Sequence, residues 1–405
     1  MSEILPALSV SDDTLELSLD SALKSRAFLI ARLSDIVCWP ATRIPAHERE
    51  LAADVLVGLL RIARLDMRER CATRLALLAD APKILLRYLA RDEIDVARPL
   101  LETSTALDES DLIATIRASM RAHWLAIATR RSLPEMVAEA LVRTCDTAVV
   151  EAVMKNKGAR LSVAALESAV IQSRTAPQIA QHLSRRPETS PAQALTMFWW
   201  ADTETRLQVL RRFAVDRAIL CDELADLFAL AAREDWADPE TRKAIALLER
   251  RQRNRKAADR SPFGSLENAI AAGGAQGFDR DLISEISYLA GVRPQTGAKI
   301  MSDRGGEGIA VLCKATGLKR DSLRALWRGL RRSDADPDNP ASPYGRVLYV
   351  FEMLATAKAQ TVLRYWNWSF TTGMTATDAA MMDATDEGLE FSPARRSAAL
   401  VFGRH

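Results

Sequence analysis

Residues 90–172 decide the fold: ARDEIDVARPLLETSTALDESDLIATIRASMRAHWLAIATRRSLPEMVAEALVRTCDTAVVEAVMKNKGARLSVAALESAVIQ. Three octets within it align as VARPLLET, HWLAIATR and VVEAVMKN, starting at residues 96, 123 and 149, with offsets of 27 and 26 residues. Each octet places apolar residues at helical spacing, and each is followed by a break and a second amphipathic segment, at 111–118, 136–142 and 164–171. The stretch therefore reads as three copies of one helical pair.

The breaks carry helix-start residues. Ser132 comes before Leu133-Pro134-Glu135, and Ser162 comes before an apolar helical run, where its hydroxyl can accept from an unpaired backbone N–H. One short pair cannot bury its apolar face alone, so a fixed period of this length predicts stacked pairs, an α-solenoid. A plain bundle whose amphipathic helices align by chance is the alternative, and the in-phase breaks favour the solenoid.

The same pattern extends in both directions. Helical stripes begin at about residue 14, and an irregular pair precedes Val96; two further pairs with drifted spacing follow Gln172. We therefore predict an all-α chain, with a solenoid of short helical pairs followed by a smaller helical region. The predicted segments are a flexible arm (1–13), the solenoid (14–248), a basic linker (249–263), a second helical region (264–332), a linker (333–342), a C-terminal helix (343–369) and a tail with little pattern, typical of partial disorder (370–405).

Composition sets few further limits. The 405 residues carry a formal net charge of +2, so no global attraction to nucleic acid or to a membrane is indicated. The five cysteines lie far apart within apolar helical patterns, which predicts buried, reduced thiols and neither disulfides nor a metal site. The sequence contains neither a secretory leader pattern nor an apolar run of 18 residues, so a cytoplasmic protein without membrane contact is expected.

A protein-binding surface is predicted from positions that recur in the repeat. Arg98 and Glu151 are equivalent, as are Glu102 and Lys155, and their identity varies while the apolar frame stays. Polar residues that vary between repeats, while the apolar residues keep their positions, are typical of a surface that binds one specific partner. The exposed face of a repeat without any partner varies in the same way. The candidate contact residues are Arg98, Glu102, His123, Arg130, Glu151 and Lys155.

A nucleic-acid-binding repeat protein is the alternative, using the basic runs 242–260 and 319–332 for phosphate contacts. Its candidate residues are Arg251, Arg253, Arg255, Lys319, Arg320 and Arg324. Catalysis is not predicted, because the carboxylates of residues 92–111 fall at helix starts, where they complement the helix dipole. No cofactor or metal is expected. The amphipathic segment 343–369 either packs back onto the second helical region or pairs with another chain.

Six runs carry a resemblance to a known family: DEIDVARPLLETS, LDESDLI, AHWLAIA, AVVEAVMKN, GARLS and, later, GEGIAVLCKATGL. Together they resemble the alphaproteobacterial domain-of-unknown-function family 2336 over roughly residues 60–330. The resemblance implies helical repeats similar to HEAT repeats, in which Pro99 would correspond to the proline kink of a first helix. It brings no catalytic residue. A non-enzymatic interaction scaffold with an unknown protein partner is therefore the expected function.

Overall fold

A computed structural model describes residues 12–40, 42–215, 230, 238 and 252–372. Over these residues the chain forms 21 helices and no strand, so the predicted all-α class is confirmed. The contacts divide the chain into two compact units, Met1–Ser168 and Ala169–His405, with the border inside helix α10.

The first unit is a succession of helices with local sequence signals at their starts. Asp108 caps α6 in a reciprocal capping box with Asp111, and the Asp146 carboxylate accepts from the first backbone amides of α9. Pro45, Pro82 and Pro134 are the N-cap residues of three others. The helices are α1 (Asp12–Val37), α2 (Ala46–Leu60), α3 (Leu65–Ala76), α4 (Lys83–Leu89), α5 (Ile94–Thr103), α6 (Glu109–Ala118), α7 (Arg121–Ala128), α8 (Glu135–Val142), α9 (Thr147–Lys155) and the first residues of α10 (Val163–Gln172).

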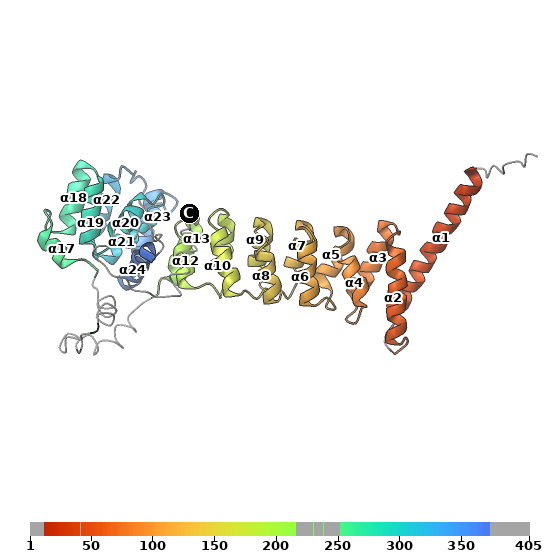
Figure 1. Ribbon diagram of the computed structural model, residues 1–405. Coiled ribbons are helices and arrows are strands. Elements are labelled where there is room, and N and C mark those ends of the chain that lie inside the picture. The colour runs from red at the N-terminus through yellow and green to blue at the C-terminus, as the bar shows by residue number, and fades with distance from the viewer. Residues whose placement is uncertain (1–11, 41, 216–229, 231–237, 239–251, 373–405) are drawn as a thin grey trace, which may run out of the picture. The chain divides into compact units, whose positions relative to one another are not determined.

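Alternate helices of the first unit pack against one another. Helix α5 contacts α3 and α7, and α7 contacts α9, while α4 contacts α2 and α8 contacts α6 (Figure 1). The side chains of Val96, Leu100, Val149 and Val153 are fully buried, as the spacing of the octets predicts. Each pair thus buries its apolar face on its neighbours, which is the contact pattern that a stack of helical pairs requires. The solenoid arrangement and the likeness to HEAT repeats stay predictions.

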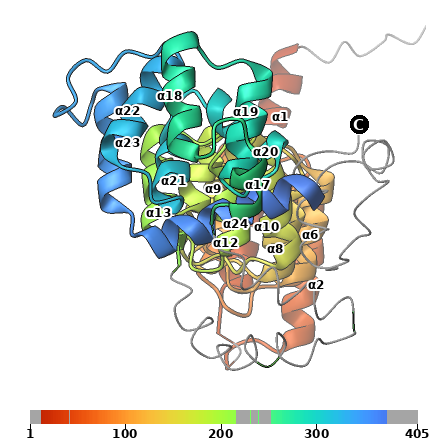
Figure 2. The same ribbon diagram turned by 90° about the vertical axis from the view of Figure 1, so that its left-hand side faces the viewer.

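The second unit gathers its later helices around α21, which contacts α20, α22, α23 and α24 (Figure 2). One core joins Phe198 and Phe213 to Ile309, Trp327 and Trp366. Its helices are α11 (Pro177–Leu183), α12 (Pro191–Met197), α13 (Thr203–Phe213), α17 (Arg255–Arg260), α18 (Leu266–Gln276), α19 (Arg280–Leu289), α20 (Pro294–Ser302), α21 (Glu307–Ala315), α22 (Arg320–Gly329), α23 (Pro343–Met353) and α24 (Thr356–Thr372).

Three sequence-based expectations differ from the structure. The single helix predicted for 343–369 is two, because the backbone becomes extended at Leu354, whose buried side chain joins the core. Helices α12 and α13, assigned to the repeat, share the core of the second unit. Cys145 is exposed, since it lies in the α8–α9 turn with a φ of 56°. Cys71 and Cys313 are buried thiols as predicted, Cys38 is half-buried, and Cys221 lies outside the described residues.

The predicted arm, basic linker and tail lie wholly or partly outside the described residues. Residues 1–11, 249–251 and 373–405 belong to the parts that the structure does not describe. Within the basic run, residues 255–260 form α17.

Candidate interaction surfaces

The charged candidate contact residues of α5 and α9 lie on the same helices as fully buried apolar residues, at positions that are exposed or half-buried. Arg98 is exposed on α5, and its guanidinium lies 3.9 Å from the Glu102 carboxylate one turn later. On α9, Lys155 is exposed and Glu151 is half-buried. An exposed pair at this spacing contributes little to stability, so its substitution is tolerated by the fold.

Arg130, also named as a contact residue, is instead tied into the packing of the first unit. Its guanidinium donates to the carbonyl oxygens of Leu101 and Ser104 at the end of α5, both at 2.6 Å. Burial lowers the pKa of Arg130. One helical pair later, the Asn156 side-chain amide donates to the carbonyls of Ala128 and Arg130, both at 2.8 Å. These contacts satisfy carbonyls that a helix end leaves without an intrahelical partner.

The second unit repeats this contact. Arg212 on α13 donates to the carbonyls of Ser184 and Arg186, which follow α11, at 2.9 and 3.0 Å. The sequence separations are 28 and 26 residues, as for Asn156, and 29 and 26 for Arg130. A polar side chain therefore recurs at the period of the repeat and caps the helix two places earlier. We call this contact the C-terminal latch.

A second recurring contact lies at the helix starts of the first unit. Arg68 on α3 pairs with Asp92 and with Glu93, the N-cap of α5, and Lys83 on α4 pairs with Asp108, the N-cap of α6. Arg121 on α7 lies 3.4 Å from Asp146, the N-cap of α9. Lys83 and Ser110 hold the pKa of Asp108 below its ordinary value. The acids at helix starts thus meet a cation from the helix two places earlier, besides the helix dipole.

His123 also makes a structural contact. Its Nε2 donates to the Asp92 carbonyl oxygen at 2.8 Å, and the ring is half-buried. The contact joins α7 to the connection before α5. The structure therefore gives two of the six candidate contact residues, His123 and Arg130, a role in holding neighbouring helices together.

Three basic residues of the nucleic-acid alternative, Arg253, Arg320 and Arg324, face carboxylates. Arg253 binds Glu267 at 2.8 Å and also donates to the Thr316 carbonyl at 2.5 Å. Arg324 binds Asp334 at 2.6 Å, and Arg320 lies 3.5 Å from Glu352. Lys319, the N-cap of α22, is exposed. Arg251 lies outside the described residues, as does the side chain of Arg255. A cation that already has a carboxylate partner is a weaker phosphate ligand.

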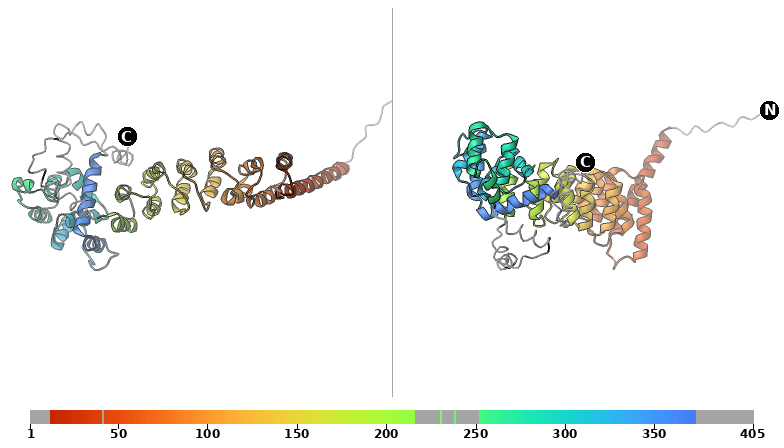
Figure 3. Two further views of the ribbon diagram at one scale, coloured as in Figure 1. Left: turned by 90° about the horizontal axis from the view of Figure 1, so that it is seen from below. Right: turned by 60° about the vertical axis from the view of Figure 1, so that its left-hand side comes forward.

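The hairpin of α1 and α2 carries apolar side chains on its outside. On α2, Leu51 and Val55 are 65% and 48% exposed one helical turn apart, and Ile62, just after the helix, is 62% exposed. Leu51 and Val55 lie opposite the buried stripe, Ala53, Leu56, Val57 and Leu60, which packs inward. On α1, Phe28 and Leu29 are exposed too. Figure 3 shows the N-terminal part of α1 extending past α2. Neighbouring exposed apolar side chains of this kind make the α1–α2 hairpin a candidate interaction surface.

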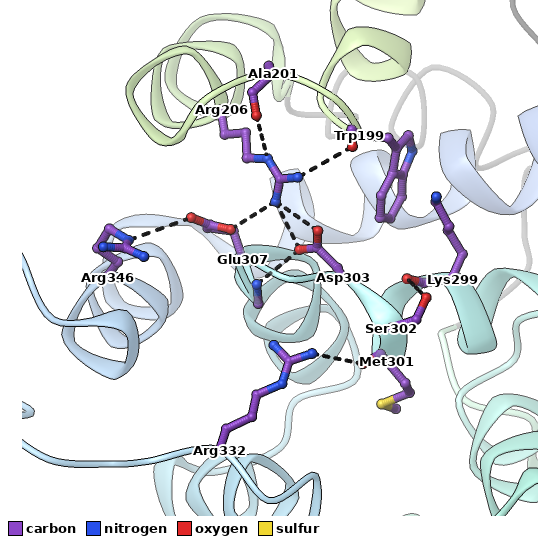
Figure 4. A network of polar contacts seen from close by, with 11 residues as sticks. Trp199, Ala201, Arg206, Lys299, Met301, Ser302, Asp303, Glu307, Arg332 and Arg346 are labelled. Atoms are coloured by element: carbon purple, nitrogen blue, oxygen red, sulfur yellow. Dashed lines mark hydrogen bonds and ion pairs between the residues drawn. The ribbon is translucent and has the colours of Figure 1, made fainter. Parts of the chain in front are cut away.

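A buried charge network lies in the second unit (Figure 4). Arg206 on α13 donates through Nη1 to both Asp303 oxygens at 2.8 and 3.0 Å and to Glu307 Oε2 at 3.1 Å. Its Nε donates to the Ala201 carbonyl at 3.0 Å. The Asp303 and Glu307 side chains are 3% and 0% exposed. Charges so deeply buried are stable only when paired in this way.

The loop that holds the two carboxylates depends on a glycine. Gly306, the N-cap of α21, has a φ of 80°, and a Cβ there would lie 2.3 Å from the Trp327 ring. The Gly306 amide donates to Asp303 at 3.0 Å, and Arg346 of α23 lies 4.0 Å from Glu307. The network therefore joins α13, the end of α20, the start of α21 and α23, and we call it a structural clamp because it connects these helices.

Two classes of site find no support within the described residues. They contain no group of three or more His, Cys, Asp or Glu side chains placed to hold a metal ion. None of their helices is long and apolar enough to span a membrane.

A family model described as an uncharacterised protein conserved in bacteria, DUF2336, matches residues 96–364, more than half of the chain. The chain belongs to DUF2336. No curated protein and no solved structure matches it. The resemblance seen in the sequence is confirmed as to family and as bacterial; its restriction to alphaproteobacteria stays a prediction.

Some of the features described above lie inside the segment that matches DUF2336, and others lie outside it. The C-terminal latches and the Arg206 network lie inside the matched segment, whereas the α1–α2 hairpin lies before it. Sequence reasoning missed both the latches and the network. A polar residue at each octet end (Arg130, Asn156) was a visible signal for the latches. No local pattern indicates the network, because Arg206 lies 97 and 101 residues from its two carboxylates.

Proposed function

We propose that this DUF2336 chain is a non-enzymatic adaptor that binds other proteins through surfaces of its helical pairs. The observation that supports it most is the apolar outer face of the α1–α2 hairpin. In stacked-repeat proteins the first and last pairs need a polar outer face to stay soluble. Here the first described pair exposes Phe28, Leu51, Val55 and Ile62 instead, so a protein surface is needed to cover it.

The occupant that the charges favour is a second copy of the same hairpin. Among the α1 side chains that the structure describes, those of residues 24–37, the exposed charged residues are cations, Lys24, Arg26 and Arg32. On α2 they are anions next to Leu51 and Val55, namely Glu48, Glu50 and Asp54. A two-fold axis brings α1 of one copy against α2 of the other, so opposite charges meet twice and apolar side chains meet between them.

A dimer formed in this way leaves the polar face of α5 and α9 available for a different protein. Arg98, Glu102, Glu151 and Lys155 are the proposed contact residues there. No observation favours the nucleic-acid alternative over this adaptor, because Arg253, Arg320 and Arg324 already have carboxylate partners. We place the protein in the cytoplasm, a proposal supported by the four described cysteines, which are free thiols.

Sedimentation velocity on the full chain tests the docking face. The wild type should sediment as a dimer at micromolar concentration, and Leu51→Ser with Val55→Ser should give a monomer. Leu77→Ser is the control, because Leu77 is 83% exposed on the same unit but lies outside the hairpin. Reversing Lys24 and Arg32 to Glu should also give a monomer, and adding Glu48→Lys and Asp54→Lys should restore the dimer. A monomeric wild type, or equal dissociation by Leu77→Ser, would refute the proposal.

A further inference from the structure

An open groove of about 770 Å³ lies on the second unit. It runs between the end of α18, the start of α19 and the end of α22, and Phe263, Phe278, Leu282 and Leu330 give it an apolar lining. Tight packing fixes the ring of Phe278. A Cβ on Gly273 of α18 would lie 2.1 Å from that ring, and one on Gly329 of α22 would lie 2.3 Å from it. Two glycines therefore let the Phe278 ring lie against both helices and form the floor.

The rim of the groove is acidic. Asp279, Asp281 and Glu285 line it from α19 and its N-cap, against a single lining cation, Arg331. Asp281 and Glu285 are one helical turn apart, so both side chains can face one ligand. An apolar floor beside three carboxylates fits a peptide that carries apolar anchors next to arginines.

We propose that this groove binds residues 391–405 of the same chain, FSPARRSAALVFGRH. This segment contains Arg395, Arg396 and Arg404 and no acidic residue, and it supplies the anchors Leu400, Val401 and Phe402. The preceding residues 373–390 carry five acids and no Lys or Arg, so they complement the rim poorly. Charge and apolar character together select the last fifteen residues.

The chain between α24 and this segment is long enough to reach the groove. The side chain of Asn367, near the end of α24, accepts from the Arg293 amide at 2.8 Å, so it lies beside the α19–α20 connection. From there the ten residues of α19 lead back to the groove, a distance of about 15 Å at 1.5 Å per residue. The eighteen residues 373–390 have a maximum reach of about 60 Å at about 3.3–3.6 Å per residue, so they are long enough to bring the segment to the groove. Because the segment belongs to the same chain, its binding to the groove is intramolecular, which favours a contact that would be weak between separate molecules.

In this arrangement Leu400 and Phe402 pack on Phe278 and Leu282, and the arginines meet the carboxylates of α19. The chain's own segment then occupies the groove, and a partner peptide of the same chemistry must compete with it. The inference does not depend on the proposed dimer, because the two sites belong to different units.

Fluorescence anisotropy with a labelled peptide of residues 391–405 tests the proposal on full-length protein. A receptor whose own tail is disabled by Leu400→Ser, Phe402→Ser, Arg395→Glu and Arg396→Glu should bind the peptide. The wild type should bind it at least about tenfold more weakly, because its own tail competes. Adding Asp281→Lys and Glu285→Lys to the tail-disabled receptor should weaken binding by about tenfold or more, and raising the salt should weaken it further.

Matched controls separate the groove from general charge effects. Asp321→Lys with Asp338→Lys reverses two exposed acids elsewhere in the same unit and should leave peptide affinity within about twofold. A peptide with Arg395→Glu and Arg396→Glu should regain affinity for the receptor with reversed Asp281 and Glu285. Failure of the tail-disabled protein to bind the wild-type peptide, or equal loss from the control reversals, overturns the proposal and leaves the groove to another ligand or to none.

Discussion

Replacing Arg206 with Met should destabilise the second unit more than any other single change to a charged residue named above. Arg206 is the partner of two carboxylates whose side chains are 3% and 0% exposed. Without it, Asp303 keeps the Gly306 amide at 3.0 Å, and Glu307 keeps Arg346 at 4.0 Å. Arg332 attracts both carboxylates without a hydrogen bond to either. Removing one partner of a buried ion pair costs about 3–5 kcal/mol, because the remaining charge stays desolvated.

Hydrogen exchange read by mass spectrometry is the suitable assay, because two units need not unfold together. Arg206→Met should lower the protection of the α13 and α21 amides by about two to four orders of magnitude, the equivalent of that free energy. The amides of α5 and α7, in the first unit, should be unchanged and serve as the internal reference.

Two further variants test whether the loss of protection comes from the unpaired buried carboxylates. Arg324→Met breaks an exposed pair with Asp334 on the same unit, so it should change protection far less. Combining Arg206→Met with Asp303→Asn and Glu307→Gln removes all three charges and should restore most of the lost protection. If Arg206→Met changed the protection of α21 by less than about tenfold, the network would not be the clamp described above.

Three further outcomes are expected. Leu100→Ala should lower the free energy of unfolding of the first unit by about 2–5 kcal/mol in urea titration, because Leu100 is fully buried. Reversing the charge of Arg98 or of Lys155 should change it by less than about 0.5 kcal/mol. A larger loss from the charge reversals than from Leu100→Ala would mean that the buried and exposed faces of the repeat are assigned the wrong way round. The pKa of Asp108 is held below the ordinary 3.8, so the ionised carboxylate stabilises the fold above that pH, and this stabilisation is lost as the pH falls through the lowered pKa. Asp108→Asn should therefore make the free energy of unfolding depend less on pH in the acid range. An unchanged pH dependence would show that the pair with Lys83 is unimportant. Of the described thiols, Cys145 should react first with a thiol reagent at pH 8. Cys71 and Cys313 should stay unreactive until the protein unfolds, because burial raises the pKa of their thiols to about 11 and about 12. Early labelling of Cys313, read by mass spectrometry, would contradict its burial.

The family and the helical class could be read from the sequence, because both depend on local patterns. Helical spacing of apolar residues predicted which side chains of α5 and α9 are buried, and Val96, Leu100, Val149 and Val153 are. Ser162 was predicted at a helix start, and its hydroxyl accepts from the Ala165 amide at 3.0 Å at the start of α10. The break at Leu354 could not be predicted, because no glycine, proline or capping residue precedes it and only the fit of α24 to the core requires it.

The surfaces were predicted less well, because a helical wheel separates inside from outside but does not say which neighbour a polar side chain meets. Arg130 and His123 look like solvent-facing candidates in the octet, yet both bind backbone carbonyls of the preceding pairs. The same limit applies to Arg253 and Arg324, whose basic runs look unopposed until Glu267 and Asp334 fold against them.

The sequence by itself determined the helices, their period and their buried stripes, since these depend on residues three or four positions apart. Only the tertiary structure decided which charges are paired, because Arg206 meets Asp303 across 97 residues. It also placed Phe278 between two glycines of different helices to form a groove floor. Contacts of this kind follow from how helices pack and not from the local chain, and they are where the candidate sites of this DUF2336 protein lie.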